Sequence, residues 1–374
     1  MPTNFQLILY PNKQNNIKMK GIILHGGHGT RLRPLTHTGP KQLLPIANKP
    51  MSEYALEDLK NIGIIEIGII IGDVYPEKVK TFYGDGSKFG VKISYIYQDK
   101  PKGISHAIGL CKEFIGDDEF VVYLGDNILR KNLKNFRSKF EIEKPDAMIL
   151  LCEVKNPNQF GVVKMNNNLQ QIEKIIEKPK NPPSNLAVIG IYFLTPKIFD
   201  IIDTLKPSWR GELEITEALQ LLMDNKGKVT FDIVTGWWKD TGTPTDIIHA
   251  NKLVLDSIGT EDQFLIDSEA KIENKIIIGK NSSISSDSII EGPVIIGNNC
   301  TLESSVKIGP YVSIGDNCSL KKCSVQNSIL MNNCIINTEV SIFDSIIANG
   351  SEIGKAKEPK KYQFLLGERS HLKL

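Results

Sequence analysis

Short apolar runs alternate with amphipathic stretches over the first two thirds of the chain. The runs at 21–24, 66–72, 92–98, 120–124 and 229–235 predict strands. Apolar residues at helical spacing between 50 and 62 predict a helix that ends at Gly63, and another helix is expected to begin near Pro244. Strands that alternate with helices favour an α/β domain with a mostly parallel sheet, which we expect to span residues 19–258.

A different pattern begins near residue 259. Aliphatic residues recur every six positions, at Ile266, Ile272, Ile278, Ile284, Ile290, Ile296, Leu302, Ile308, Ile314 and Leu320. A period of six is typical of a parallel β-helix built from hexapeptide turns, so we predict such a domain at 259–354. Three hexapeptides make one coil, so Cys300 and Cys318 should stack inside it. The phase breaks at Gln326 and resumes at Leu330, which indicates a short insertion or a bent coil.

Composition narrows the class of protein. The 374 residues include 45 basic and 43 acidic side chains, and a net charge of +2 gives no overall attraction to nucleic acid or to an anionic membrane. No apolar run approaches the length of a membrane span. Six scattered cysteines without a CxxC pair favour a reducing cytoplasm and argue against a structural zinc site.

The two ends of the chain carry weaker signals. Residues 1–18 lack the features of a signal peptide and are expected to form a disordered extension, with Met19 as an alternative start. The tail at 355–374 is basic and then apolar, and we expect it to cap the β-helix or to dock on a neighbour.

A glycine-rich loop with fixed cations follows the first predicted strand. Gly26, Gly27 and Gly29 lack a Cβ, so the backbone there can turn its N–H groups toward an anion. Arg31 and Lys41 then add positive charge, as a polyphosphate site requires. Prolines at 34, 40 and 45 exclude a helix directly after the loop, which separates it from the GxxxxGK[ST] and GxGxxG loops.

Two aspartates follow predicted strands and indicate a metal site. Asp126 lies in the string GDN directly after the run at 120–124, and Asp240 lies in the string GWWKDTGT after the run at 229–235. Either could simply begin a turn. Ligands of open α/β sheets bind beyond the carboxyl ends of the strands, and Mg²⁺ is commonly shared between one or two carboxylates and substrate phosphates. The pair therefore predicts Mg²⁺ as the cofactor.

The strings GGHGTRLRPLT and PKQLLPI resemble the signature of the sugar-1-phosphate nucleotidyltransferases, in particular the glucose-1-phosphate thymidylyltransferases. The two-domain layout resembles the long type of that family. The resemblance implies a Rossmann-like, mostly parallel α/β domain followed by a left-handed parallel β-helix of hexapeptide repeats. His25 is a departure, because most of the family has alanine there.

The resemblance also assigns roles to residues. It implies catalytic roles for Arg31, Lys41 and Asp126, and metal binding by Asp126 and Asp240. It implies that the nucleotide is bound by Leu24, Gly26, Gly27, Gly29, Thr30, Arg31, Gln98 and Gly103. QDKPKGISHA resembles the family's QPxPxGLAQA, where the glutamine contacts the pyrimidine; here His106 replaces the second glutamine and Asp99 the first proline.

The binding site for the sugar phosphate is predicted from the string IIEKPKNP. Glu177 and Lys178 stand side by side before a proline, and a surface ion pair is the alternative interpretation of the two residues alone. Adjacent strand residues point to opposite faces, so both can reach one ligand only where the strand ends or bulges. The resemblance implies that the sugar phosphate is bound by Gly161, Glu177, Lys178, Val188 and Tyr192. Phe160 replaces the more frequent tyrosine before Gly161.

These observations predict a Mg²⁺-dependent cytoplasmic enzyme that joins dTTP and glucose 1-phosphate to give dTDP-glucose and pyrophosphate. UTP is the alternative substrate, because a methyl group in an apolar pocket is worth only about 1–3 kcal/mol. A β-helix acyltransferase would need a histidine, and none occurs between His249 and His371. A non-catalytic role is disfavoured because the four charged site residues are all present, namely Arg31, Lys41, Asp126 and Asp240. We expect a homo-oligomer, since a β-helix offers flat sides for association.

Overall fold

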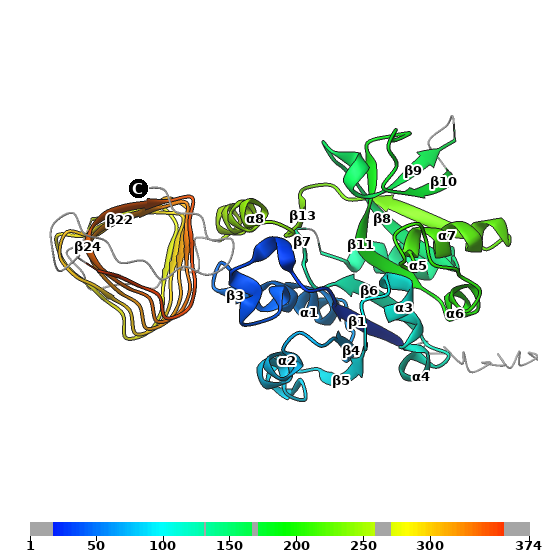
Figure 1. Cartoon of the computed structure of the whole chain (residues 1–374), viewed down its shortest axis with the longest axis horizontal. Helices are drawn as coiled ribbons and strands as arrows, with labels where there is room; N and C mark the ends of the chain where they lie inside the picture. Colours follow the sequence, from blue (N-terminus) through cyan, green and yellow to red (C-terminus); the bar gives the residue numbers. More distant parts are fainter. Residues whose placement is uncertain (1–17, 131, 167–170, 259–270, 355–374) are drawn as a thin grey trace, which may run out of the picture.

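The computed structural model describes residues 18–130, 132–166, 171–258 and 271–354. Residues 1–17 of the extension predicted at 1–18, the tail at 355–374 and Ile266 lie outside these residues. Figure 1 shows two bodies, an α/β domain and a prism of triangular cross-section, with helix α8 (Pro244–Asp256) between them. Among the described residues, no helix is both long and apolar enough to cross a bilayer.

Four parallel strands form the centre of the α/β domain. Strands β1 (Met19–His25), β4 (Glu66–Ile71), β5 (Lys92–Tyr97) and β6 (Glu119–Leu124) lie in the order β6-β1-β4-β5. Side chains of β1 alternate between two cores, with Ile23 packed on one face of the sheet and Ile22 on the other. Both faces are thus covered, as a parallel sheet requires. The predicted α/β fold with a mostly parallel sheet is confirmed.

Further strands extend the sheet beyond β6. Strand β11 (Leu186–Leu194) pairs antiparallel with β6 and also with β8 (Ala147–Glu153), and β8 runs parallel to β12 (Val229–Ile233). Strands β9 (Gly161–Met165) and β10 (Ile172–Glu177) form a hairpin on β11. The last strand of this hairpin ends at the predicted sugar-binding string.

Helices cover the sheet and connect its strands. They are α1 (Met51–Asn61), α2 (Pro76–Tyr83), α3 (Ile104–Gly109), α4 (Lys112–Ile115), α5 (Lys134–Glu143), α6 (Lys197–Ile202) and α7 (Ile215–Asp224). The helices predicted at 50–62 and from Pro244 are present. Between the glycine-rich loop and α1 the helical structure is limited to three single 3₁₀ turns, η1 (Thr30–Leu32), η2 (Leu35–His37) and η3 (Lys41–Leu43), in agreement with the three prolines. The short strands β2 (Pro45–Ile46) and β3 (Lys49–Pro50) follow them.

The second domain is a stack of short parallel strands consistent with the predicted β-helix. One face carries β15 (Ile276–Ile278), β18 (Val294–Ile296), β21 (Val312–Ile314), β23 (Ile329–Leu330) and β25 (Ile346–Ile347). The other two faces carry β14 (Lys271–Glu273), β16 (Ser283–Ile284), β17 (Ile289–Glu291), β19 (Thr301–Leu302), β20 (Lys307–Ile308), β22 (Ser319–Gln326), β24 (Ile335–Phe343) and β26 (Glu352–Gly354). Val294 pairs with Val312, eighteen residues on, and Cys300 and Cys318 are both buried inside the stack as predicted.

The break in the six-residue phase has a different cause from the one predicted. Leu320 pairs with Ile336, only sixteen residues on, and Val325 pairs with Ile342, seventeen residues on. The coil is therefore shortened, so the predicted insertion was wrong, and the pairing is irregular between Lys321 and Cys323. Cys323 takes the buried position that the strict period would give to Ser324. A corner can lose a residue because only the strand positions between corners must stay in register.

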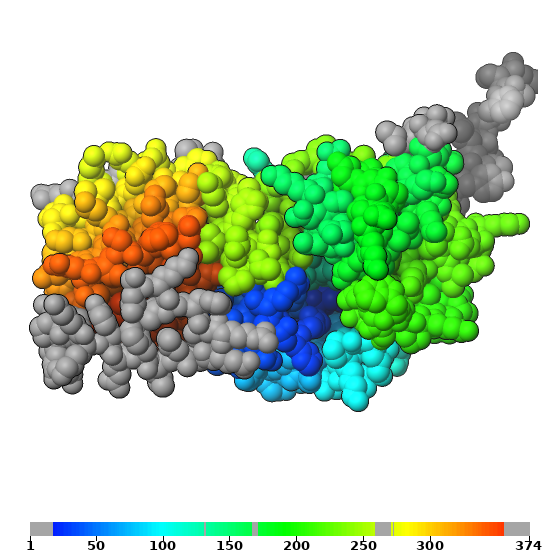
Figure 2. Space-filling view, turned by 45° about the horizontal axis from the view of Figure 1, so that its top comes forward, coloured from blue at the N-terminus to red at the C-terminus, as the bar shows by residue number. Residues whose placement is uncertain are grey.

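The two domains share a hydrophobic cluster. It consists of Leu32, Leu44, Ile46, Met51, Ile128, Ile247 and Ala250 from the first domain and Ile329 and Met331 from the second. Asn251 of α8 accepts from the backbone N–H of Ala47 and from the hydroxyl of Ser313, each at 2.8 Å. Figure 2 shows the surface of the stack abutting α8 and the blue segment that follows β1. The interface is thus made by residues that neighbour the glycine-rich loop.

Candidate active-site cleft

Two adjoining cavities lie beyond the carboxyl ends of β1 and β6, of about 250 and 760 Å³. They share the lining residues Ile104, Leu124, Asp126 and Glu212. Asp126 stands where they meet, because it directly follows the buried strand β6 and the turn at Gly125. This is the position at which open α/β sheets bind ligands.

The smaller cavity is lined by the glycine-rich loop and by the segment after β5. Leu24, Gly26, Gly27, Gln98 and Gly103 all contribute to its wall. The side-chain amide of Gln42 donates to the backbone oxygen of Gly26 at 2.9 Å, which holds the start of the loop in place.

Gly103 is required by close packing at one edge of this cavity. Its φ is +105°, and a Cβ at this position would lie 2.5 Å from the backbone oxygen of Leu213. The backbone N–H of Leu213 in turn donates to the oxygen of Lys102 at 2.8 Å, and that of Ser105 donates to the oxygen of Leu213 at 3.0 Å. The loop of the smaller cavity is thereby joined to the loop that carries Arg210 and Glu212 in the larger one.

Lys41 and Asp126 form an ion pair at the junction of the cavities. The ammonium group of Lys41 bonds to Oδ2 of Asp126, and the Asn127 amide donates to Oδ1 at 2.9 Å. Burial acts to raise the pKa of Asp126, but the charge and the hydrogen bonds outweigh it, so the pKa lies below its ordinary value. Conversely, burial acts to lower the pKa of Lys41, and the carboxylate raises it above its ordinary value.

Asp240 is brought to the same place by a small second sheet. Strand β13 (Trp238–Asp240) pairs antiparallel with β7 (Asn127–Leu129), so that Asp240 lies opposite Asn127. The hydroxyl of Thr241 donates to the backbone oxygen of Asp126 at 2.6 Å, which holds the two strands together. Burial and the neighbouring carboxylate of Asp126 raise the pKa of Asp240 to about 6.

The carboxylates of Asp126 and Asp240 could hold a divalent cation that also binds phosphate. The described residues contain no cluster of three or more acidic, histidine or cysteine side chains able to hold a metal. Two half-buried carboxylates that repel each other are nevertheless present, and both are hard oxygen donors. A magnesium ion would relieve this repulsion and take its remaining ligands from water and substrate phosphates.

The larger cavity contains the residues predicted for the sugar phosphate. Gly161, Glu177, Lys178, Val188 and Tyr192 all line it. Strand β10 ends at Glu177, and Lys178 has a φ of +40°, so the strand stops where both neighbours can face one space. The surface ion-pair interpretation is incomplete, because the 3.7 Å pair of Glu177 and Lys178 lies in the cavity wall.

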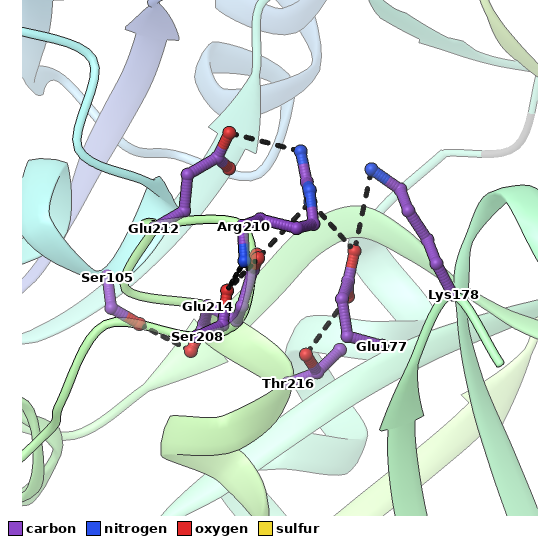
Figure 3. A network of polar contacts seen from close by, with 8 residues as sticks. All are labelled: Ser105, Glu177, Lys178, Ser208, Arg210, Glu212, Glu214 and Thr216. Carbon is purple, nitrogen blue, oxygen red and sulfur yellow. Dashed lines mark hydrogen bonds and ion pairs between the residues drawn. The ribbon is translucent and has the colours of Figure 1, made fainter.

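A group of charged residues that sequence reasoning missed completes this cavity. Arg210 lies 3.5 Å from Glu177, 3.1 Å from Glu212 and 3.2 Å from Glu214, measured between guanidinium nitrogens and carboxylate oxygens. Figure 3 shows Arg210 and Lys178 both directed toward Glu177. The string RGELEIT marks a charged loop directly before the amphipathic helix α7, but it does not show that this loop lies beside Glu177.

The remaining predicted residues lie at the edge of the cleft. Arg31 lines the larger cavity and passes close to Gly242, where a Cβ would lie 3.0 Å from its Nη2. Gly29 and Thr30 belong to the same loop but line neither cavity. Gly29 has a φ of +60° and caps the turn η1 that carries Arg31. Its backbone oxygen accepts from the hydroxyl of Thr36 at 2.8 Å.

His25 is buried directly behind the cleft. Its side chain is only 4% exposed, and neither ring nitrogen has a hydrogen-bond partner among the described residues. The imidazole packs edge-on against the ring of Tyr83, with centroids 5.8 Å apart. Burial lowers the pKa of His25 to about 3, although the carboxylate of Asp126 acts in the opposite direction. The ring is therefore neutral at physiological pH.

Comparison with known proteins gives the same division into two parts. Residues 20–257 match the nucleotidyl transferase family, and residues 290–373 match the GMPPB C-terminal domain. The low-salt glycan biosynthesis nucleotidyltransferase Agl11 of Haloferax volcanii is 47% identical over 95% of this chain and 100% of its own length. A glucose-1-phosphate thymidylyltransferase of Streptomyces griseus is 41% identical over 71% of this chain and 74% of its own.

A solved structure is similar to the first domain. It is a Bacillus anthracis protein, described as a glucose-1-phosphate thymidylyltransferase and crystallised with sucrose, with 43% identity and a TM-score of 0.61. The match covers 64% of this chain and 96% of that protein.

Proposed function

Because this chain belongs to the nucleotidyl transferase family and is a sugar-1-phosphate nucleotidyltransferase, we propose that its substrates are dTTP and glucose 1-phosphate, which it converts to dTDP-glucose and pyrophosphate. The observation that carries the proposal is the meeting of two cavities at Asp126. One cavity is lined by a glycine-rich loop and an amide, and the other by carboxylates and cations. A nucleotide and a sugar phosphate laid in them would meet at their phosphates.

The reaction requires positioning and charge stabilisation but no covalent nucleophile. A phosphate oxygen of the sugar phosphate attacks the α-phosphorus of the nucleotide in line, the bond to the β-phosphate breaks, and pyrophosphate leaves. Arg31 is placed to bind the triphosphate and the departing pyrophosphate. Lys41 neutralises charge on the phosphates during transfer, once substrate oxygens compete with Asp126 for its ammonium group.

Asp126 and Asp240 are the residues that would hold Mg²⁺. The ion would neutralise charge on the phosphates, and its preference for hard oxygen ligands matches the two carboxylates. Burial, and after it the carboxylate of Asp126, raises the pKa of Asp240 to about 6, so a cation beside the two carboxylates would offset both effects. A bound ion would therefore favour the charged form of both side chains.

The sugar side is assigned from its charges. Glu177 accepts from the hydroxyl of Thr216 at 3.0 Å and keeps its second oxygen near Arg210 and Lys178. We assign Glu177 to the sugar hydroxyls, and the two cations to the sugar's phosphate. Gly161 allows this arrangement, since a Cβ there would lie 2.4 Å from Cγ2 of Thr216.

UTP is the second candidate donor. Thymine and uracil differ by one methyl group, and the smaller cavity contains apolar lining from Leu24, Ile104 and Ala107 that would accept either base. The glycan role of the Haloferax volcanii relative also allows another sugar phosphate.

The test is pyrophosphate release with Mg²⁺ and glucose 1-phosphate, comparing dTTP, UTP, ATP and GTP at equal concentration. We expect the highest kcat/KM with dTTP, and a decrease of about 10²–10³ in kcat for Asp126→Asn. Equal rates with dTTP and UTP would make the protein a broad pyrimidine enzyme. Full activity of Asp126→Asn with Mg²⁺ would refute the metal assignment, and no release with any of the four nucleotides would refute the reaction with this sugar phosphate.

A further inference from the structure

An imidazole fixes the amide in the wall of the smaller cavity. Gln98 follows β5, and its side chain is 5% exposed. Its Nε2 lies 2.9 Å from Nδ1 of His106, which belongs to the first turns of α3. Its Oε1 faces the glycine-rich loop, where a Cβ on Gly26 would lie 3.7 Å away.

The polarity of this contact follows from the charge state of the ring. Burial lowers the pKa of His106 below 6.5, Lys102 lowers it further, and the carboxylate of Asp99 acts in the opposite direction. At pH 7.5 the ring is therefore neutral and has one nitrogen with a lone pair. With the ring proton on Nε2, Nδ1 accepts one N–H of the Gln98 amide. Besides the N–H used in this contact, the amide has a second N–H and the acceptor Oε1.

We propose that His106 holds the Gln98 amide in one of its two orientations, and that the site thereby selects thymine and uracil over cytosine. The inference rests on the proposed function, in which Gln98 faces the base. His106 is a positioning residue in this proposal, since it acts through Gln98 and does not touch the substrate.

The selection follows from the edges of the bases. Thymine and uracil present an N3–H donor next to a carbonyl acceptor, whereas cytosine presents an N3 acceptor next to an amino donor. An amide of fixed orientation offers its C=O and its N–H in a fixed order, so it pairs with the first pattern and sets donor against donor in the second. An amide free to rotate by 180° would satisfy both patterns.

Replacements of His106 test whether the Gln98 amide needs a hydrogen-bond acceptor at this position. His106→Asp keeps an oxygen near the place of Nδ1 that can only accept, whereas His106→Leu and His106→Ala provide no acceptor. His106 is only partly buried, so these variants are expected to fold. His249→Leu, at an exposed position on α8, is the control for loss of an imidazole elsewhere.

The measurement is the equilibrium Kd of dTTP and of dCTP at pH 7.5 with Mg²⁺ and without sugar phosphate, followed by kcat/KM for both. A bidentate match corresponds to roughly 10- to 100-fold tighter binding of dTTP by the wild type and by His249→Leu. His106→Asp should retain this ratio even if it weakens both nucleotides. His106→Leu and His106→Ala should reduce the ratio about tenfold or more.

Two results would overturn the proposal. One is an unchanged ratio in the variants without an acceptor, and the other is an equal loss in His106→Asp and His106→Leu, which would mean that only the shape of the ring matters. Binding requires no turnover, so the two proposals fail separately. If the wild type prefers dTTP over dCTP but releases no pyrophosphate, the proposed reaction is contradicted, whereas a loss of that preference in His106→Leu but not in His106→Asp still supports the role of His106.

Discussion

The buried imidazole of His25 predicts a loss of stability in mild acid. In the folded chain the pKa of His25 is about 3, and in the unfolded chain it returns to the ordinary 6.5. Between these values the unfolded chain binds a proton that the folded chain does not. Stability from this group is therefore complete above pH 6.5 and is lost progressively as the pH falls toward 3.

The magnitude follows from the two pKa values. Each pH unit within the window costs about 1.4 kcal/mol, so a change from pH 7.5 to pH 5.5 should remove about 1.3 kcal/mol through this residue. Carboxyl groups with raised pKa values also titrate in this pH range. A protein that lacks only His25 isolates the contribution, because those groups act equally in both chains.

The replacement His25→Leu supplies this comparison. Leucine is apolar and similar in size, and it removes two buried nitrogens that lack partners among the described residues. We expect its free energy of unfolding at pH 7.5 to equal or exceed that of the wild type, since a buried unpaired polar group costs about 1–3 kcal/mol. His37→Leu, at an exposed position, is the matched control.

The assay is urea unfolding in EDTA at pH 7.5, 6.5 and 5.5, with the first transition followed by fluorescence and the m-value compared among the chains. The difference between wild type and His25→Leu should widen by about 1.3 kcal/mol from pH 7.5 to 5.5. Parallel pH profiles for the two chains would refute the reasoning, and an equal change in His37→Leu would assign it to exposed imidazoles.

Further predictions concern both domains. Asp240→Asn should lower kcat by about 10²–10³ with Mg²⁺ present, measured by pyrophosphate release; unchanged turnover would exclude it as a metal ligand. Arg210→Gln should raise the KM for glucose 1-phosphate about tenfold or more and leave the KM for dTTP within about twofold. Gly161→Ala should also raise the KM for glucose 1-phosphate selectively, because its Cβ would lie 2.4 Å from Thr216. Equal increases in the KM of both substrates would argue against the assignment of the larger cavity to the sugar phosphate. In the second domain, Ile314→Ala should lower the free energy of unfolding by about 2–5 kcal/mol, since Ile314 is fully buried. The matched control Ile335→Ala, at a side chain that is 44% exposed, should cost much less in the same urea assay.

The periodicities of the sequence predicted both domains because each reflects which side chains face a core. Short apolar runs located β1, β4, β5 and β6, helical spacing located α1, and the six-residue repeat located the stack. The antiparallel hairpin β9–β10 was not predicted, because its pairing with β11 depends on contacts between distant segments. The shortened corner near Cys323 was misread, because the loss of one residue and the gain of several disturb a repeat in the same way.

The sequence predicted the position of those site residues that directly follow a buried strand. Asp126 and the glycine-rich loop follow buried strands directly, so their place at one edge of the sheet could be inferred. Arg210 could not, since it reaches Glu177 across thirty-three residues of chain and through a loop that has no strand of its own. His25 directly follows the apolar run at 21–24, and only the structure shows that its ring packs on Tyr83 and has no hydrogen-bond partner among the described residues.

The hydrophobic cluster between the domains makes the second domain part of the structure of the first. Leu32 directly follows Arg31, and Leu44 lies three residues after Lys41, yet both pack in the cluster that Ile329 and Met331 complete. A protein cut after α8 would expose this apolar surface to water and leave the phosphate-binding segment without its support. A relative with only the first domain must therefore cover the same surface with polar replacements or with a second subunit. The two domains are thus distinct in their chain topology, but the first domain depends on the second to bury part of its apolar surface.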